Sequence, residues 1–250
     1  ARVKIDSPYG ALGIKADGSG NLRGGFKGTL AAVGKQLAYR GCTLDQPSLY
    51  GTVSISGQRP AFQGPLRFDA LACQAGGLTI ARSAVAMRAS ANVALDRVSG
   101  SLGPQAGAIR AAGFAASNLR GKIDFAATAQ QVDADVDLAL AKPAASGIGF
   151  ADMAAKGIAV LRLGGASPGW SFEGRAEGSA LTVDRARLAG LDDAVAASAN
   201  LPVGPLVARM AQAARRALPG SDLALDLQAR GGGDSLALTI PRLSLTSARG

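Results

Sequence analysis

The sequence contains no histidine among its 250 residues. This absence excludes Ser-His and Cys-His catalytic triads and metal sites built on imidazole. The Ser-x-x-Lys pair of acylating enzymes and the glycine-rich phosphate loop that ends in Lys-Ser or Lys-Thr are also missing. No other catalytic constellation stands out. We therefore expect a protein that is not an enzyme and that has no cofactor and no metal site.

Long apolar runs and aromatic residues are scarce as well. No run reaches the ~18 apolar residues that a membrane-spanning helix needs. Phe, Tyr and Trp make up only 4% of the chain although 48% of it is hydrophobic, and alanine supplies much of that fraction. A closed sandwich of this length would use more aromatic residues to reach native packing density. The composition indicates an unusually lean protein.

The acidic residues give no convincing ligand set. Asp133, Asp135 and Asp137 alternate along one predicted strand, where same-face neighbours lie about 6.6 Å apart, and no glycine turn wraps a cation there. We interpret them as a solvated strand face. The pair Asp192-Asp193 is assigned to a turn.

Cys42 and Cys73 are the only cysteines. Two cysteines do not make a disulfide framework, but they can form one structural bridge in an oxidising compartment. Both lie beside turn-forming residues, and a strongly curled sheet would bring them together. The sequence leaves open whether they are bridged or are two buried thiols.

The formal net charge is +9. The Arg and Lys residues are scattered along the predicted outer rows, and few aromatic residues accompany them for base stacking, so we expect no nucleic-acid partner. A generally basic exterior is one interpretation. Attraction to phospholipid headgroups is the functional one.

A motif of a bulky apolar residue, any residue, glycine, any residue and a second bulky apolar residue recurs along the chain. It occurs at Leu22–Phe26, Leu49–Val53 (continuing to Ile55), Phe62–Leu66 (continuing to Phe68) and Leu119–Ile123 (continuing to Phe125), with a variant at Trp170–Ala176. Side chains of a strand alternate between its two faces, so each segment has one apolar face, and residues such as Arg23, Lys122 and Glu173 lie on the other.

The glycine of each motif lies on the apolar face. Glycine inside a strand costs stability and usually marks a bend, a bulge or the close approach of another group. Its recurrence indicates a sheet curled around its own apolar face. We expect these glycines, Gly64 and Gly121 among them, to leave space for a ligand; a bend or a bulge is the alternative.

Alternating segments continue at 132–140, 223–227 and 236–245, and turn-forming stretches such as Asp17–Gly20 separate the strands. Short connections favour antiparallel neighbours. We expect an all-β fold: a long, curled antiparallel β-sheet that forms an open hydrophobic groove, with one short amphipathic helix. No linker divides the chain, so residues 1–250 are predicted to be a single continuous segment. The chain has no initiator Met, and its strand pattern runs to both ends, which suggests a fragment of a longer protein.

One segment, at about 205–218, is predicted to be helical. It opens with Pro205, is rich in alanine, carries basic residues in its last turn and is followed by Pro219-Gly220. Its apolar stripe consists of Leu206, Met210, Ala213, Ala214 and Ala217. We expect it to pack on the sheet; the functional alternative is a plug or rim element that covers part of the apolar face.

The segments Asn21–Leu30 and Gln63–Phe68, together with a helix inside a strand-rich region, resemble the AsmA-like proteins of the repeating β-groove bridge architecture. This family includes TamB and YdbH. The likeness is greatest to the YdbH branch of Gram-negative bacteria and extends over most of the chain. It implies a periplasmic protein of the cell envelope, anchored in the inner membrane through a segment absent from this sequence. It also implies phospholipid transport toward the outer membrane, and hence a role in outer-membrane biogenesis.

The resemblance and the apolar rows together predict the partners. The groove binds phospholipid acyl chains, and contacts with the inner and outer membranes are made by missing regions or by partner proteins. The residues expected to face the groove and contact lipid are Leu22, Phe26, Val53, Ile55, Leu66, Phe68, Leu119, Ile123, Phe125, Val136, Leu138 and Leu225. Two rival interpretations are a β-helix or passenger-type surface protein and a closed β-barrel or sandwich binding module.

Overall fold

The computed structural model describes residues 2–21, 25–164, 169–200, 203–232 and 235–247. Seventeen strands of one sheet lie within them. The strands are β1 (Arg2–Ser7), β2 (Gly10–Asn21), β3 (Gly25–Gly34), β4 (Gln36–Tyr39), β5 (Cys42–Asp45), β6 (Ser48–Ser56), β7 (Arg59–Cys73), β8 (Leu78–Ala91), β9 (Arg97–Ala111), β10 (Phe114–Thr128), β11 (Gln131–Ala145), β12 (Ile148–Gly149), β13 (Asp152–Arg162), β14 (Gly169–Ser179), β15 (Thr182–Val183), β16 (Asp222–Gly232) and β17 (Ser235–Thr246). The helices are α1 (Arg185–Ser198) and α2 (Gly204–Ala217), and a 3-10 turn spans Ala75–Gly77.

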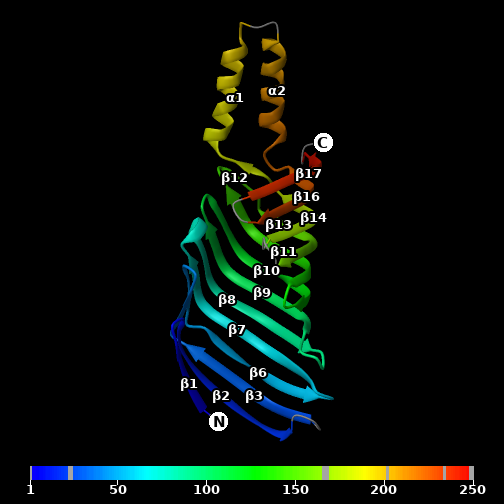
Figure 1. The fold of residues 1–250 in the computed structure, drawn as a ribbon. Helices are drawn as coiled ribbons and strands as arrows, with labels where there is room; N and C mark the ends of the chain where they lie inside the picture. Colours follow the sequence, from blue (N-terminus) through cyan, green and yellow to red (C-terminus); the bar gives the residue numbers. More distant parts are fainter. Residues whose placement is uncertain (1, 22–24, 165–168, 201–202, 233–234, 248–250) are drawn as a thin grey trace.

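The strands form a long antiparallel meander, as the sequence predicts. The principal ladder runs β1–β2–β3–β6–β7–β8–β9–β10–β11–β13–β14–β16–β17, and the short strands β4, β5, β12 and β15 branch from it. Within the described residues β1 pairs only with β2, and β17 only with β16. The sheet is therefore open, and Figure 1 shows its strands stacked from β1 at one end to β17 beside the helices.

This architecture rules out both rival folds. A closed barrel would join the first strand to the last, which the pairing of β1 and β17 does not do. A β-helix would stack its rungs in parallel, whereas every described ladder here is antiparallel.

Residues in the left-handed region interrupt the strands along one line of the sheet. Arg82, Asn118 and Lys142 have φ values of 53°, 49° and 49°. Arg82 and Asn118 lie on either side of Gly107, where the ideal Cβ position is 2.9 Å from Nε of Arg82. Each such residue shifts the alternation by one position. In β8, for example, Ile80 is half-buried at an even-numbered position before Arg82, and Met87 is half-buried at an odd-numbered position after it.

Glycines on the apolar face lie where neighbouring strands come very close together. A Cβ on Gly64 would lie 2.1 Å from the carbonyl oxygen of Tyr50, and one on Gly121 would lie 2.2 Å from that of Asp137. Real Cβ atoms do not come this close to backbone, so only glycine fits. The expectation that Gly64 and Gly121 leave space for a ligand is wrong, because the adjacent strand already fills that space.

The stretch Asp17–Gly20 is part of β2 and not a turn. Its Gly18 stands opposite Gly28 of β3, and a Cβ there would lie 2.8 Å from the Cα of Gly28. The glycines that make this stretch look like a turn are therefore explained by the close approach of β2 and β3.

The predicted helix at 205–218 is confirmed as α2. A second helix, α1, precedes it and was not predicted; Asp192 and Asp193 lie inside it, so their assignment to a turn is wrong. The side chain of Asp184 caps α1 by accepting a 2.8 Å hydrogen bond from the backbone N–H of Arg187.

The predicted position of the helix is also wrong. The two helices pack mainly on each other as a hairpin inserted between β15 and β16, and Figure 1 shows them projecting away from the sheet. Helix α2 therefore neither packs on the sheet nor plugs its apolar face. None of the helices in the described part of the chain is long and apolar enough to cross a membrane.

Candidate functional site: an open apolar groove

The register of the strands joins small and apolar residues of one face into continuous rows. One row takes one residue from each of twelve strands, from β2 to β17: Gly18, Gly28, Val53, Phe62, Ala89, Gly100, Phe125, Ala134, Ala159, Phe172, Ala229 and Leu238. At about 4.8 Å between strands, this row is about 50 Å long. No polar or charged side chain interrupts it.

Eleven of the twelve predicted groove residues belong to this face, and Leu22 lies outside the described residues. Val53 and Phe125 are in the row given above, Ile123 pairs with Val136 in the next row, and Phe26 pairs with Ile55. The register links Leu138 to Leu225 through Ala155 and Ala176, and Phe68 to Leu119 through Ser83 and Ala106. Leu66 pairs with Leu49 and Val85. All eleven are half-buried.

The sequence did not identify the contribution of β8 and β9 to the groove. Met87 pairs with Leu102, which in turn pairs with Ile123, so both strands complete the row between β7 and β10. Strand β8 carries no apolar-x-Gly motif, and its left-handed residue Arg82 breaks the alternation; reading the alternation separately on each side of Arg82 would have revealed this strand. Strand β9 does carry the motif, as Val98-x-Gly100-x-Leu102, and this signal was overlooked.

Three phenylalanines cover the glycine pairs of the groove. Each belongs to a Phe-x-Gly sequence: Phe26-x-Gly28, Phe62-x-Gly64 and Phe172-x-Gly174. Ideal Cβ positions on Gly18, Gly51 and Gly157, each in the preceding strand, lie 2.5, 2.7 and 2.9 Å from the Cζ of Phe26, Phe62 and Phe172, respectively. Each ring therefore lies over the glycines and replaces their missing side chains, an arrangement known to stabilise glycine in sheets.

The opposite face is polar along the same strands. Its central row consists of Asp17, Thr29, Thr52, Gln63, Arg88, Ser101, Asp124, Asp135, Ile158, Glu173, Gln228 and Thr239. Asp133, Asp135 and Asp137 are exposed on this face, and Asp137 forms a 3.1 Å ion pair with Lys156. A groove with one wet and one apolar face follows from this alternation.

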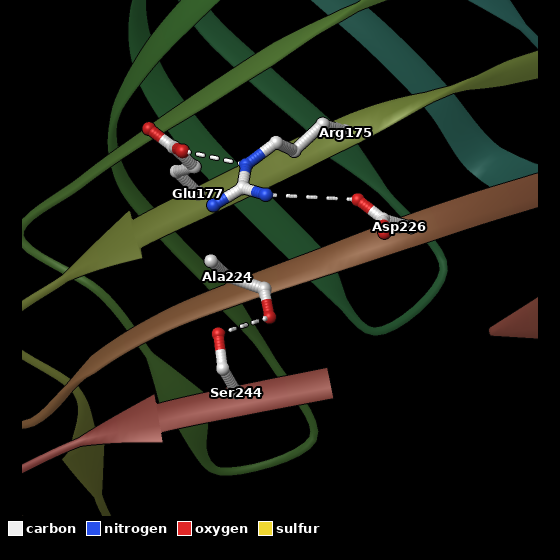
Figure 2. A network of polar contacts seen from close by, with 5 residues as sticks. All are labelled: Arg175, Glu177, Ala224, Asp226 and Ser244. Carbon is white, nitrogen blue, oxygen red and sulfur yellow. Dashed lines mark hydrogen bonds and ion pairs between the residues drawn. The ribbon is translucent and has the colours of Figure 1, made fainter. Parts of the chain in front are cut away.

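Figure 2 shows part of this polar face, where β14 and β16 meet. Nε of Arg175 donates a 2.7 Å hydrogen bond to Glu177, and its Nη1 lies 3.8 Å from Asp226. The hydrogen bond and charge of Glu177 raise the pKa of Arg175, with a smaller contribution from Asp226. Ser244 of β17 donates a 3.3 Å hydrogen bond to the carbonyl oxygen of Ala224. Arg175 and Glu177 are exposed and Asp226 is half-buried, so these charged groups keep this face in water more than they stabilise the fold.

Near one end of the groove, segments that are distant in sequence surround one hollow. Its volume is about 750 Å³, and Leu161, Leu163, Trp170, Leu236 and Arg40 are among the residues that line it. Trp170 is 44% exposed and Leu236 is 72% exposed. Arg40 comes from the β4–β5 hairpin, so this hairpin reaches toward strands more than 100 residues later in the chain.

A disulfide fixes the β4–β5 hairpin to the sheet. Cys42 of β5 and Cys73 of β7 stand directly opposite each other, and their sulfur atoms are 2.13 Å apart. Tyr39, which pairs with Cys42 at the same end of the hairpin, packs its ring edge-on against Tyr9, with 5.4 Å between the ring centroids. The bridge and the ring contact hold a branch strand that has no place in the principal ladder.

The molecule has almost no core. The buried apolar residues in the described part of the chain are Ala106, Ala116, Ala176, Leu181 and Ala211. The accessible surface is 16205 Å², against about 10,000 Å² for a compact monomer of 24.9 kDa. The bulky apolar residues instead line a face that no second layer of the described chain covers. These features define an open-groove β-sheet protein with a continuous apolar lining.

Comparison with known proteins identifies the family. The profile of the YdbH-like family, described as intermembrane phospholipid transport protein YdbH, matches residues 10–250. The chain belongs to this family. No curated protein and no solved structure matches the chain significantly.

Proposed function

We propose that this chain is a non-enzymatic, lipid-binding segment of a bridge that moves phospholipids between the inner and outer membranes across the periplasm. The acyl chains lie in the open groove, and the headgroups remain in water. The observation that carries the proposal is the unbroken apolar row from Gly18 to Leu238, which no other layer covers among the residues that the structure describes.

The energetics favour acyl chains as the ligand. Soluble monomers rarely expose continuous apolar patches larger than a few hundred Å² without a partner. Each methylene that leaves water for the groove contributes roughly 0.8 kcal/mol. A row without a polar interruption lets a chain advance from strand to strand without exposing its methylenes at any step. Transport along it requires continuity and no chemistry.

The disulfide supports the cellular compartment in this proposal. A bridge between Cys42 and Cys73 is stable in the oxidising periplasm and would be reduced in the cytosol. Family membership supports a path that connects two membranes. In this proposal the inner-membrane anchor is a segment outside the present sequence.

Photo-crosslinking at neighbouring residues of one strand tests the groove. Leu66 and Arg67, Ile123 and Lys122, and Leu138 and Asp137 are matched pairs, because the two members of each pair face opposite sides of the sheet. We expect a photo-reactive group at the apolar member to capture phospholipid in cells, and the group at its neighbour to capture none.

Native mass spectrometry of the gently extracted protein gives an independent measure of bound lipid. We expect phospholipid to remain bound to the wild-type chain. Equal crosslinking of both members of the pairs, or a chain that carries no lipid, would contradict the groove as the lipid path.

A further inference from the structure

The α1–α2 hairpin is an addition that the sheet does not need. Strand β14 pairs directly with β16, although the hairpin lies between them in sequence. Figure 1 shows both helices extending beyond the last strands, with the C-terminal end of α1 and the N-terminal end of α2 farthest from the sheet. The hairpin therefore presents its tip to whatever lies beyond this end of the groove.

One face of each helix is used for packing within the hairpin. On α2, Ala211 is buried, and Val207 and Ala214 are half-buried, at positions that share one face. On α1, Leu188 and Val195 are half-buried. The two helices contact each other, so these faces account for the contact.

A second apolar stripe on α2 takes no part in this packing. Leu206 is 59% exposed and Met210 is 63% exposed, and both lie on one side of the helix about a quarter-turn from the face that meets α1. Val203, just before α2, is 50% exposed. The sequence from 194 to 208 contains no charged residue, so the whole end of the hairpin is uncharged.

The charges beside this stripe have one sign. Helix α2 contains Arg209, Arg215 and Arg216 and no acidic residue. Arg215 is paired with Asp192 of α1, whereas Arg209 and Arg216 are exposed and form no ion pair within the described residues. They lie seven positions apart on one side of the helix: Arg209 is beside Leu206 and Met210, and Arg216 is on the same side nearer the base of the hairpin. An exposed apolar stripe bordered by arginine is the pattern of a helix that lies in a membrane interface.

We propose that the tip of the α1–α2 hairpin inserts into the interface of a bilayer that contains anionic phospholipids. Leu206, Met210 and Val203 enter the acyl region, and Arg209 and Arg216 bind lipid phosphates. A bilayer is the partner that fits both features, because its apolar interior and its negatively charged surface lie close enough together for one helix to contact both. This contact goes beyond the proposed groove function, since it places one membrane contact inside this chain.

Flotation with vesicles of phosphatidylcholine, with or without phosphatidylglycerol, tests the proposal on the 250-residue chain. We expect binding to the anionic vesicles. Leu206→Glu combined with Met210→Glu should weaken it by roughly tenfold or more, because two side chains lose their apolar burial. Arg209→Gln and Arg216→Gln should each weaken binding about fivefold, and only to anionic vesicles. Ala186→Glu, an exposed position at the base of α1, is the matched control and should leave binding unchanged.

A fluorescent probe reports the depth of insertion. Both native cysteines are bridged, so Val203→Cys provides a single site for an environment-sensitive dye. We expect the emission to shift to the blue on anionic vesicles and to be quenched by lipids with a quencher in the acyl chain. The same dye at Ala186→Cys should show neither effect. Far-UV circular dichroism of each variant verifies that the fold is intact.

The absence of vesicle binding, binding that survives Leu206→Glu with Met210→Glu, or an unshifted dye at Val203→Cys would each overturn the proposal. Lipid bound in the groove, measured by native mass spectrometry on the same variants, separates the two functions. Loss of vesicle binding with groove lipid retained supports the hairpin as a distinct membrane contact. Absence of groove lipid with intact vesicle binding would refute the groove and leave the hairpin proposal standing.

Discussion

Replacing Gly64 with alanine should destabilise the sheet, although alanine is normally tolerated better than glycine in a strand. A Cβ at this position would lie 2.1 Å from the carbonyl oxygen of Tyr50 and 2.5 Å from the Cα of Gly51. Both contacts are to backbone, which cannot rotate away as a side chain would. Strands β6 and β7 must therefore separate locally to admit one methyl group.

The magnitude follows from three contributions. Forcing a group into a filled site costs typically 1–3 kcal/mol. Displacing a ladder carbonyl by about 1 Å weakens a hydrogen bond worth roughly 0.5–1.5 kcal/mol. Replacing glycine recovers roughly 0.5–1 kcal/mol of conformational entropy. The expected loss in free energy of unfolding is about 1–3 kcal/mol, and Gly121→Ala should behave alike because its Cβ would lie 2.2 Å from the carbonyl oxygen of Asp137.

Urea unfolding followed by far-UV circular dichroism measures this loss, and Gly103→Ala is the control. Gly103 also lies in a strand, but its nearest neighbour would be the Cβ of Ala86 at 3.5 Å, an ordinary contact. This variant should be unchanged or slightly more stable. If Gly64→Ala were as stable as Gly103→Ala and bound less lipid, the glycine would be a space-maker for the ligand, and the close-approach argument would be refuted.

Three further predictions concern the disulfide, the shape and the polar face. Cys42→Ser with Cys73→Ser, which opens a bridge across 31 positions, should lower the free energy of unfolding by about 2–4 kcal/mol; equal stability of the variant in urea would contradict this role. Small-angle scattering should give a radius of gyration of roughly 25 Å for a ladder of about 60 Å prolonged by helices of about 20 Å. A value near the ~18 Å of a compact domain would exclude the open groove. Arg175→Gln should leave the melting temperature and its pH dependence unchanged, because the raised pKa of Arg175 keeps it protonated at all ordinary pH and because its first partner, Glu177, is exposed while the second, Asp226, lies 3.8 Å away. A clear drop in melting temperature would show that the network on the polar face stabilises the fold.

The alternation of residues made the groove face predictable from the sequence. Ile123 and Val136 are two residues of separate segments that each alternate cleanly, and the structure pairs them directly. Period 2 is a local property of a strand, so it can be read without knowledge of the neighbours. The prediction of groove residues failed where a left-handed residue such as Arg82 shifts the period, because a φ of 53° cannot be inferred from the local composition.

The helical hairpin was only half predicted, for a related reason. Helix α2 has a strong apolar stripe and a Pro near its start, which identify it alone. Helix α1 has a weak stripe rich in alanine and an acidic pair in its middle, which resembles a turn. Its stability comes from packing against α2, and contacts between two elements cannot be recognised from the residue pattern of one of them.

The sequence by itself determined an all-β chain with one wet and one apolar face and with too few bulky side chains for a closed core. These are consequences of composition and of the alternation that any strand imposes. Only the tertiary structure decided that the sheet stays open, that Cys42 and Cys73 are opposite partners, and that the glycines serve close approach instead of ligand space. Each of these depends on how far one strand lies from the next and in which register. That distance is set by the twist and curl accumulated over the whole sheet, which no single segment contains.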